Sequence, residues 1–211
     1  MQNKIKPHTK YYADFNSLKV ANGIMGEFQI LRNIVRTDYL ELLFIAKDVH
    51  KKPKKFVALY RACLVQLFTV IEADMYGFNS LDPFDASKTK KNFRNIFLNT
   101  FKQIGKTWTK NEIVEVYISN YFNELMLIKE ERNDLTHPKK ITKIISPSIV
   151  DLIRLETAFL NYVDFIKNLT NGFFIAAIPQ LTFEQIMELK EQSEAFGLTL
   201  RSFTIDDVNI L

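Results

Sequence analysis

The stretch of sequence that decides the fold is Phe56–Tyr76, which reads FVALYRACLVQLFTVIEADMY. Apolar residues occur almost all the way around a helix built from it, and such a helix is normally enclosed by other helices. Gly77 and the loop through Asp82–Asp85 predict where this helix stops. The stretch is therefore typical of the central helix of a bundle.

Periodic apolar patterns occur on both sides of this stretch. They predict helices at about 12–36, 38–50, 86–106, 111–133 and 147–169. Gly23 and Gly26 are expected to weaken the first helix, Lys51–Lys55 to form a loop, and Ser146 to cap the last helix. Six glycines and six prolines are few for 211 residues, which argues against an all-β protein. The predicted fold class is therefore all-α, a helical bundle.

The C-terminal part of the chain has a different character. Phe173–Ile178 and Leu198–Ile205 are strand-like, and Thr182–Gln185 has the pattern of a capping box that starts a helix. We expect residues 1–170 to form the helical domain. Residues 171–211 are expected to form a small strand–helix–strand appendage that packs on it, or to be part of the same domain.

Composition favours a soluble, cytoplasmic protein. The single cysteine, Cys63, lies in an apolar run and is expected to be a buried structural thiol. The N-terminal residues have charge but no apolar stretch behind them, so they do not resemble a secretory signal. No eighteen apolar residues occur in succession, and a membrane span is therefore not expected.

The net charge of +4 is unevenly distributed. Residues 86–111 contain seven basic and no acidic side chains, and residues 47–55 contain five lysines and one aspartate. The last thirty-two residues carry six acidic and two basic side chains. A basic body with an acidic tail is compatible with a polyanionic partner. An ordinary solvated, lysine-rich face explains the same pattern equally well.

Searches for common catalytic motifs leave one segment. The sequence has no glycine-rich phosphate loop, no nucleophile elbow and no Cys/His cluster, and its three histidines are scattered, so no metal or cofactor is expected. The remaining segment is Glu131–Pro138, which reads ERNDLTHP. Within it Arg132 continues an apolar stripe, so its guanidinium should be partly withdrawn from water and should need a partner.

The spacing of Arg132 and His137 predicts a helix end between them. Five residues of a regular helix rotate by about 140°, so these two side chains cannot share one helical face. Pro138 disfavours the helical region for the residue before it. We therefore expect the helix to end near Asp134–Thr136, with His137 on a turn that can swing back towards Arg132.

An arginine and a histidine brought together suit chemistry on a phosphate. A guanidinium can bind two phosphate oxygens and oppose the charge that accumulates on phosphorus. An imidazole, with an unperturbed pKa of about 6.5, can take or give a proton near neutral pH. On RNA the proton to remove is that of the 2′-hydroxyl, and this route needs no metal.

Arg132-Asn133, followed by His137-Pro138 at the end of a long helix, resembles the signature of the HEPN superfamily. That signature is an arginine, usually followed by a polar residue, and a histidine after four to six intervening positions; here four intervene. The resemblance implies a helical bundle that forms a homodimer with two motifs facing each other. It also implies a metal-independent endoribonuclease that leaves 2′,3′-cyclic phosphate ends, often as a toxin or phage-defence effector.

The resemblance also implies roles for individual residues. Arg132 would stabilise the phosphorane, His137 would act as acid or base, and Asn133 would help to position the phosphate. Glu72, on the central helix, would be the acidic partner of Arg132, and Asp134 would support the site. The basic side chains expected along an RNA backbone are Lys88, Lys90, Lys91, Arg94, Lys139 and Lys140. The implied partners are RNA, a second copy of the chain and an antitoxin or other regulatory protein.

Two other functions remain open at this point. Some HEPN members lack activity, so the chain could be a non-catalytic module that binds a nucleotide, a nucleic acid or a protein partner, or a structural oligomerisation domain. Arg132 could then form a purely structural ion pair with Glu72, and His137 could be a turn residue. Trp108, Tyr117 and Tyr121 are expected in the core rather than on a surface where bases stack.

Overall fold

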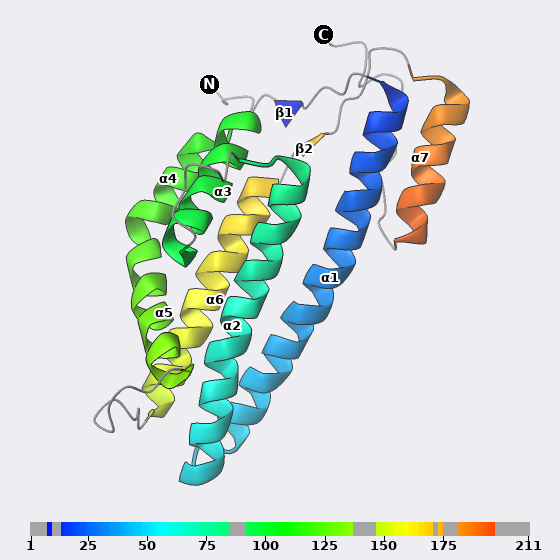
Figure 1. Ribbon diagram of the computed structural model, residues 1–211. Coiled ribbons are helices and arrows are strands. Elements are labelled where there is room, and N and C mark those ends of the chain that lie inside the picture. Colours follow the sequence, from blue (N-terminus) through cyan, green and yellow to red (C-terminus); the bar gives the residue numbers. More distant parts are fainter. Residues whose placement is uncertain are drawn as a thin grey trace, which may run out of the picture.

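The computed structural model describes residues 14–84, 92–136, 147–170 and 181–196, together with the backbone of two short strands. The helices of this part are α1 (Phe15–Asp48), α2 (Pro53–Leu81), α3 (Phe93–Thr107), α4 (Asn111–Asn120), α5 (Phe122–Thr136), α6 (Ile149–Thr170) and α7 (Phe183–Ala195). Strand β1 (His8–Thr9) pairs in parallel with β2 (Phe173–Phe174) (Figure 1). The all-α prediction is confirmed.

Helix α2 lies at the centre of the bundle and packs against α1, α3, α5 and α6 (Figure 1). Its buried side chains extend from Phe56 to Phe78, as its apolar sequence predicts. By length and composition alone α2 could also cross a membrane, and among the described helices this holds for α2 only. The same apolar character is expected of a helix enclosed by other helices.

Aromatic rings fill the core between α2, α3, α5 and α6. The ring centroid of Phe97 lies 4.6 Å from that of Phe101 and 4.8 Å from that of Phe122. Trp108 is fully buried and donates its indole N–H to Asp82 Oδ2 at 2.7 Å. Cys63 is buried as expected, and burial raises the pKa of its thiol to about 12.

The sequence placed a break between residues 36 and 38 that the structure does not have, because α1 is one helix of 34 residues. Its two glycines do not interrupt it, and they make room for the segment that packs on it. A Cβ atom at Gly26 would lie 2.2 Å from the ring of Phe196, which follows α7. The Asn22 amide donates to Gln192 Oε1 at 2.9 Å and to Ser193 Oγ at 3.1 Å. Helix α7 therefore packs on the first half of α1.

Both predicted ends of the central helix were wrong. Helix α2 begins at Pro53, because proline is accommodated in the first helical turn, where its missing N–H has no partner to lose. It continues past Gly77 to Leu81, because Gly77 serves packing rather than termination. A Cβ atom at Gly77 would lie only 2.0 Å from a ring carbon of Phe28 of α1. The α1–α2 contact thus depends on the absence of a side chain there.

Replacement of Gly77 by alanine is expected to lower the free energy of unfolding by about 1–3 kcal/mol, the usual cost of overpacking a core. The higher helix propensity of alanine, about 1 kcal/mol, offsets part of this cost. Gly23→Ala is the matched control, because its Cβ would meet only the end of the Gln192 side chain, at 3.1 Å. Urea unfolding of both variants tests this. Equal stability of Gly77→Ala and wild type would contradict it.

The helix expected at 111–133 is interrupted at Tyr121, which separates α4 from α5. The rings of Tyr117 and Phe122 both pack on Phe97, with centroids 6.0 and 4.8 Å away. These two residues are five positions apart, and a regular helix would rotate them by about 140°. The break allows both rings to reach the core. It also leaves Tyr121 40% exposed, so the prediction that it is a core residue was wrong, whereas Trp108 and Tyr117 are buried.

The ends of the last two helices follow local capping chemistry. Helix α6 begins after Ser148, whose N–H and hydroxyl both donate to Asp151 Oδ2 at 2.7 Å, so Ser148 is its cap. The predicted cap, Ser146, lies outside the described residues. Helix α7 starts with the expected capping box between Thr182 and Gln185. Strand β2 pairs with β1, from the N-terminal part of the chain. The predicted strand Leu198–Ile205 and residues 86–91 of the helix predicted at 86–106 lie outside the described residues.

Candidate functional site

Helix α5 is described as far as Thr136, and the turn predicted at His137 lies outside the described residues. Arg132 is half-buried, as its place on the apolar stripe predicts, and its Nη1 donates to Asn133 Oδ1 at 3.4 Å. Asn133 is exposed and Asp134 is half-buried. His137 lies outside the described residues, as do Lys139 and Lys140. The described part of the motif therefore occupies the last turn and a half of α5.

One turn before Arg132, the side chain of Lys129 is enclosed by aromatic rings. Its Nζ lies 4.6 Å from the ring centroid of Phe68 and 4.7 Å from that of Phe93. It also lies 3.4 Å from Glu72 Oε1, and only 8% of the side chain is exposed. A cation over aromatic faces is stabilised by their quadrupoles, which partly offsets the cost of burying this charge.

The ion pair found for Glu72 is thus with Lys129, whereas the sequence assigned Glu72 to Arg132. Helical side chains point back towards the N-terminus of their helix, so the side chain of Lys129 extends towards the start of α5 and away from Arg132. Helices α2 and α5 pack against each other, and the Glu72 carboxylate reaches Lys129 across that contact. Half of the Glu72 side chain is exposed, so this carboxylate lies at the edge of the bundle.

Lys129 and Arg132 form a concentrated positive charge at this end of α5. Burial lowers the pKa of Lys129, and the positive charge of Arg132 lowers it further, while Glu72 opposes both effects. The Glu72 carboxylate pairs with the first of these cations, Lys129. Arg132 is the more exposed of the two.

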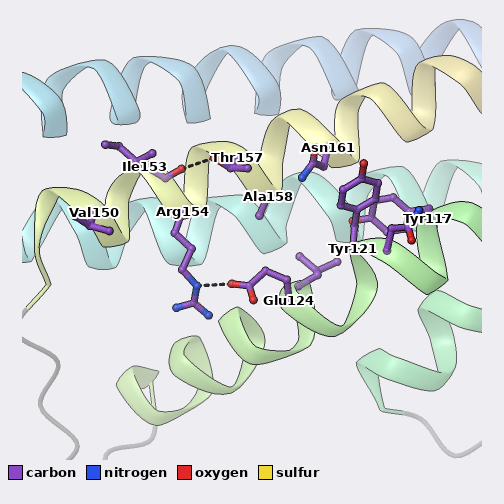
Figure 2. Close-up of a pocket in the computed structure, with 11 residues that line it drawn as sticks. Tyr117, Tyr121, Glu124, Val150, Ile153, Arg154, Thr157, Ala158 and Asn161 are labelled. Atoms are coloured by element: carbon purple, nitrogen blue, oxygen red, sulfur yellow. Dashed lines mark hydrogen bonds and ion pairs between the residues drawn. The ribbon is translucent and has the colours of Figure 1, made fainter.

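On the other side of Arg132, Glu131 is held by two neighbouring helices. Arg154 of α6 donates from Nη1 to Glu131. It also donates from Nε to Glu124, as Figure 2 shows. The Tyr60 hydroxyl of α2 donates to Glu131 Oε2 at 3.2 Å. Burial lowers the pKa of Arg154, but the hydrogen bonds with Glu131 and Glu124 outweigh this effect and raise it overall. These contacts fix the backbone of α5 beside Arg132.

Of the six basic residues expected along an RNA backbone, Arg94 is the one that the described residues include. It is exposed, in the first turn of α3, and its guanidinium lies 5.5 Å from the ring centroid of Phe122 in α5. The adjacent Phe93 contacts Lys129. The start of α3 therefore packs on α5 near Lys129 and Arg132. Lys88, Lys90 and Lys91 lie outside the described residues.

A second polar cluster lies inside the bundle. Asp74 of α2 is fully buried, and its Oδ2 accepts from Arg36 Nη2 at 2.9 Å, while Arg32 Nε lies 3.6 Å from its Oδ1. Burial raises the pKa of Asp74, against the opposing effect of Arg36 and Arg32. The hydroxyl of the buried Tyr162, from α6, adds to this polar interior. The cluster links α1 to α2 and is the main charged interaction of the core.

The sequence missed Lys129, Glu131 and Arg154 as parts of the site. Lys129 carried a weak signal, because it lies three residues before Arg132 and so shares its side of the helix. The pairing of Glu131 with Arg154 had none, because the two residues are 23 positions apart on different helices. Within the described residues no group of three or more metal-ligating side chains occurs.

Known proteins offer no further guide to this site. A family assignment would require a match to a family model or to a close relative, and a shared fold would require a similar solved structure. Comparison of the chain with protein families, curated proteins and solved structures gives no match.

Proposed function

We propose that this chain is a metal-independent endoribonuclease of the HEPN type that acts as a homodimer. The observation that carries the proposal is the half-buried Arg132 on the last described turns of α5, one turn after the enclosed Lys129. Pro138 disfavours the helical region for His137, so we expect a turn there that brings the imidazole back towards Arg132. The half-burial of Arg132 and the positive charge of Lys129 beside it support binding of a phosphate at the same place.

In the proposed reaction His137 takes the proton of a ribose 2′-hydroxyl, and the 2′-oxygen attacks the adjacent phosphorus. Arg132 opposes the charge of the phosphorane with its guanidinium, and Asn133 orients a phosphate oxygen. The bond from phosphorus to the 5′-oxygen then breaks. The imidazolium of His137 returns the proton to that oxygen, which leaves a 2′,3′-cyclic phosphate and a 5′-hydroxyl end.

The cellular role proposed here is that of a toxin or phage-defence effector in the cytoplasm, where its RNA substrate is found. Unrestrained RNA cleavage would damage the cell that makes the enzyme, so an antitoxin or other regulatory protein is the expected partner. The RNA backbone would be bound by Arg94 together with Lys88, Lys90, Lys91, Lys139 and Lys140. Binding should then weaken as salt increases, because each phosphate contact releases counterions.

The direct test is incubation of the purified chain with total RNA in EDTA. Wild type is expected to cleave it and to leave cyclic phosphate ends, because the proposed reaction uses no metal. Arg132→Ala, purified in the same way, should cleave about 10²–10³-fold more slowly, the cost of losing one group that stabilises the charge of a transition state. Equal rates for the two proteins would point to a contaminating nuclease and contradict the assignment.

Absence of cleavage by wild type, at concentrations where the protein is dimeric, would contradict catalysis itself. Salt-sensitive RNA binding without turnover would then favour the non-catalytic module that the sequence left open. Binding and cleavage should be measured in the same buffer, since phosphate contacts depend steeply on salt concentration.

A further inference from the structure

A pocket of about 410 Å³ lies between α6 and the junction of α4 with α5 (Figure 2). This volume is within the range of sites that bind small molecules. Val150, Ile153 and Ala158 contribute an apolar wall from α6. Tyr117 and Tyr121 lie at the other end, with ring centroids 5.8 Å apart. The pocket therefore suits a flat, largely apolar ring.

Polar groups line the same end of the pocket as the tyrosines. Asn120 and Asn161 both line it, and neither carboxamide makes a hydrogen bond to another described residue. Tyr121 is 40% exposed and lies at the break between α4 and α5. A ring stacked on Tyr121 would find amide donors and acceptors at its edge, which is how proteins recognise bases of single-stranded RNA.

The charge of the pocket argues against a phosphate ligand. Arg154 is the cation among its lining residues, and it is already paired with Glu124 and Glu131. These three side chains sum to one negative charge. The Glu124 carboxylate is exposed and can accept hydrogen bonds from an amino group, as acidic side chains do from the cytosine amino group. The pocket thus suits an uncharged ring that carries an amino group.

We infer that this pocket binds a nucleobase with an exocyclic amino group, from the nucleotide next to the cleaved phosphate. The inference rests on the proposed function for its ligand, because the substrate proposed above is RNA. Arg154 connects the pocket to the motif, since it binds both Glu124 and Glu131, the neighbour of Arg132. Seven residues separate these glutamates, about 10 Å along α5, so one strand can reach both places.

The experiment is a calorimetric titration of the full chain with guanosine, adenosine, cytidine and uridine in turn. The three amino-bearing nucleosides are expected to bind at least tenfold more tightly than uridine. Tyr121→Ala should weaken their binding about fivefold or more, because stacking on an aromatic ring contributes at least that much per base. Tyr121→Phe keeps the ring and should bind as wild type does. Glu124→Gln should reduce the preference over uridine.

The outcomes separate this inference from the proposed function. Suppose that wild type cleaves RNA but binds no nucleoside, or that Tyr121→Ala binds nucleosides as wild type does. Either result would overturn the inference about the pocket and leave the proposed ribonuclease activity intact. Nucleoside binding that depends on Tyr121, with no cleavage of RNA, would support base binding in the pocket and contradict the proposed catalysis. Thermal unfolding of Tyr121→Ala checks its fold. Should that variant be unstable, Asn161→Leu, at a half-buried position, provides the same comparison.

Discussion

His137→Ala is expected to slow RNA cleavage by about 10²–10⁴-fold, the usual contribution of a positioned acid or base. The expectation comes from Pro138, which disfavours the helical region for His137 and so favours a turn there. On a turn, rather than on a continued helix, the imidazole can reach the phosphate that the Arg132 guanidinium binds. Single-turnover cleavage of a short RNA by saturating enzyme measures the chemical step separately from RNA binding.

His50 provides the matched control for this experiment. It is an exposed histidine after α1, and its Nδ1 lies 2.7 Å from the carbonyl oxygen of Lys47. His50→Ala should therefore cleave RNA at the wild-type rate. A His137→Ala rate within threefold of wild type, or equal losses in both variants, would contradict the proposed role of His137. The affinity of His137→Ala for RNA should remain near that of wild type, since Arg132 and the basic residues expected along the RNA backbone are unchanged.

Features set by a single segment could be predicted from the sequence. The enclosure of α2 followed from apolar residues on all its sides. The capping box of α7 was also local, because its two partners are three residues apart. In each case the physical cause lies within one turn or one face of a helix.

Features that depend on packing between segments could not be predicted. Gly26 and Gly77 were interpreted as helix breakers, because the sequence does not reveal that the rings of Phe196 and Phe28 occupy the space above them. The break at Tyr121 likewise depends on where Phe97 lies. The ion pair of Glu72 with Lys129 depends on how α2 and α5 pack side by side. Propensity and periodicity describe one element at a time, and tertiary contacts override them at these positions.

Asp74→Ala is expected to lower the free energy of unfolding by about 3–5 kcal/mol, the usual result of removing one partner from a buried ion pair. Asp74 is fully buried, and it is the carboxylate that faces both Arg32 and Arg36. Without it the two guanidinium groups lose the carboxylate that pairs with both among the described residues, and burial already lowers the pKa of Arg32. Urea unfolding monitored by circular dichroism measures the loss.

Two further variants show whether the loss comes from unpaired charge. Glu156→Ala removes the partner of Lys47 in an ion pair that is 30–42% exposed, so it should cost no more than about 1 kcal/mol. Asp74→Leu combined with Arg32→Met and Arg36→Met removes the whole cluster and should recover most of the stability, since well-packed apolar side chains can replace a buried ionic group. A loss below about 1 kcal/mol for Asp74→Ala would show that water reaches the arginines, and the link between α1 and α2 would then be apolar packing alone.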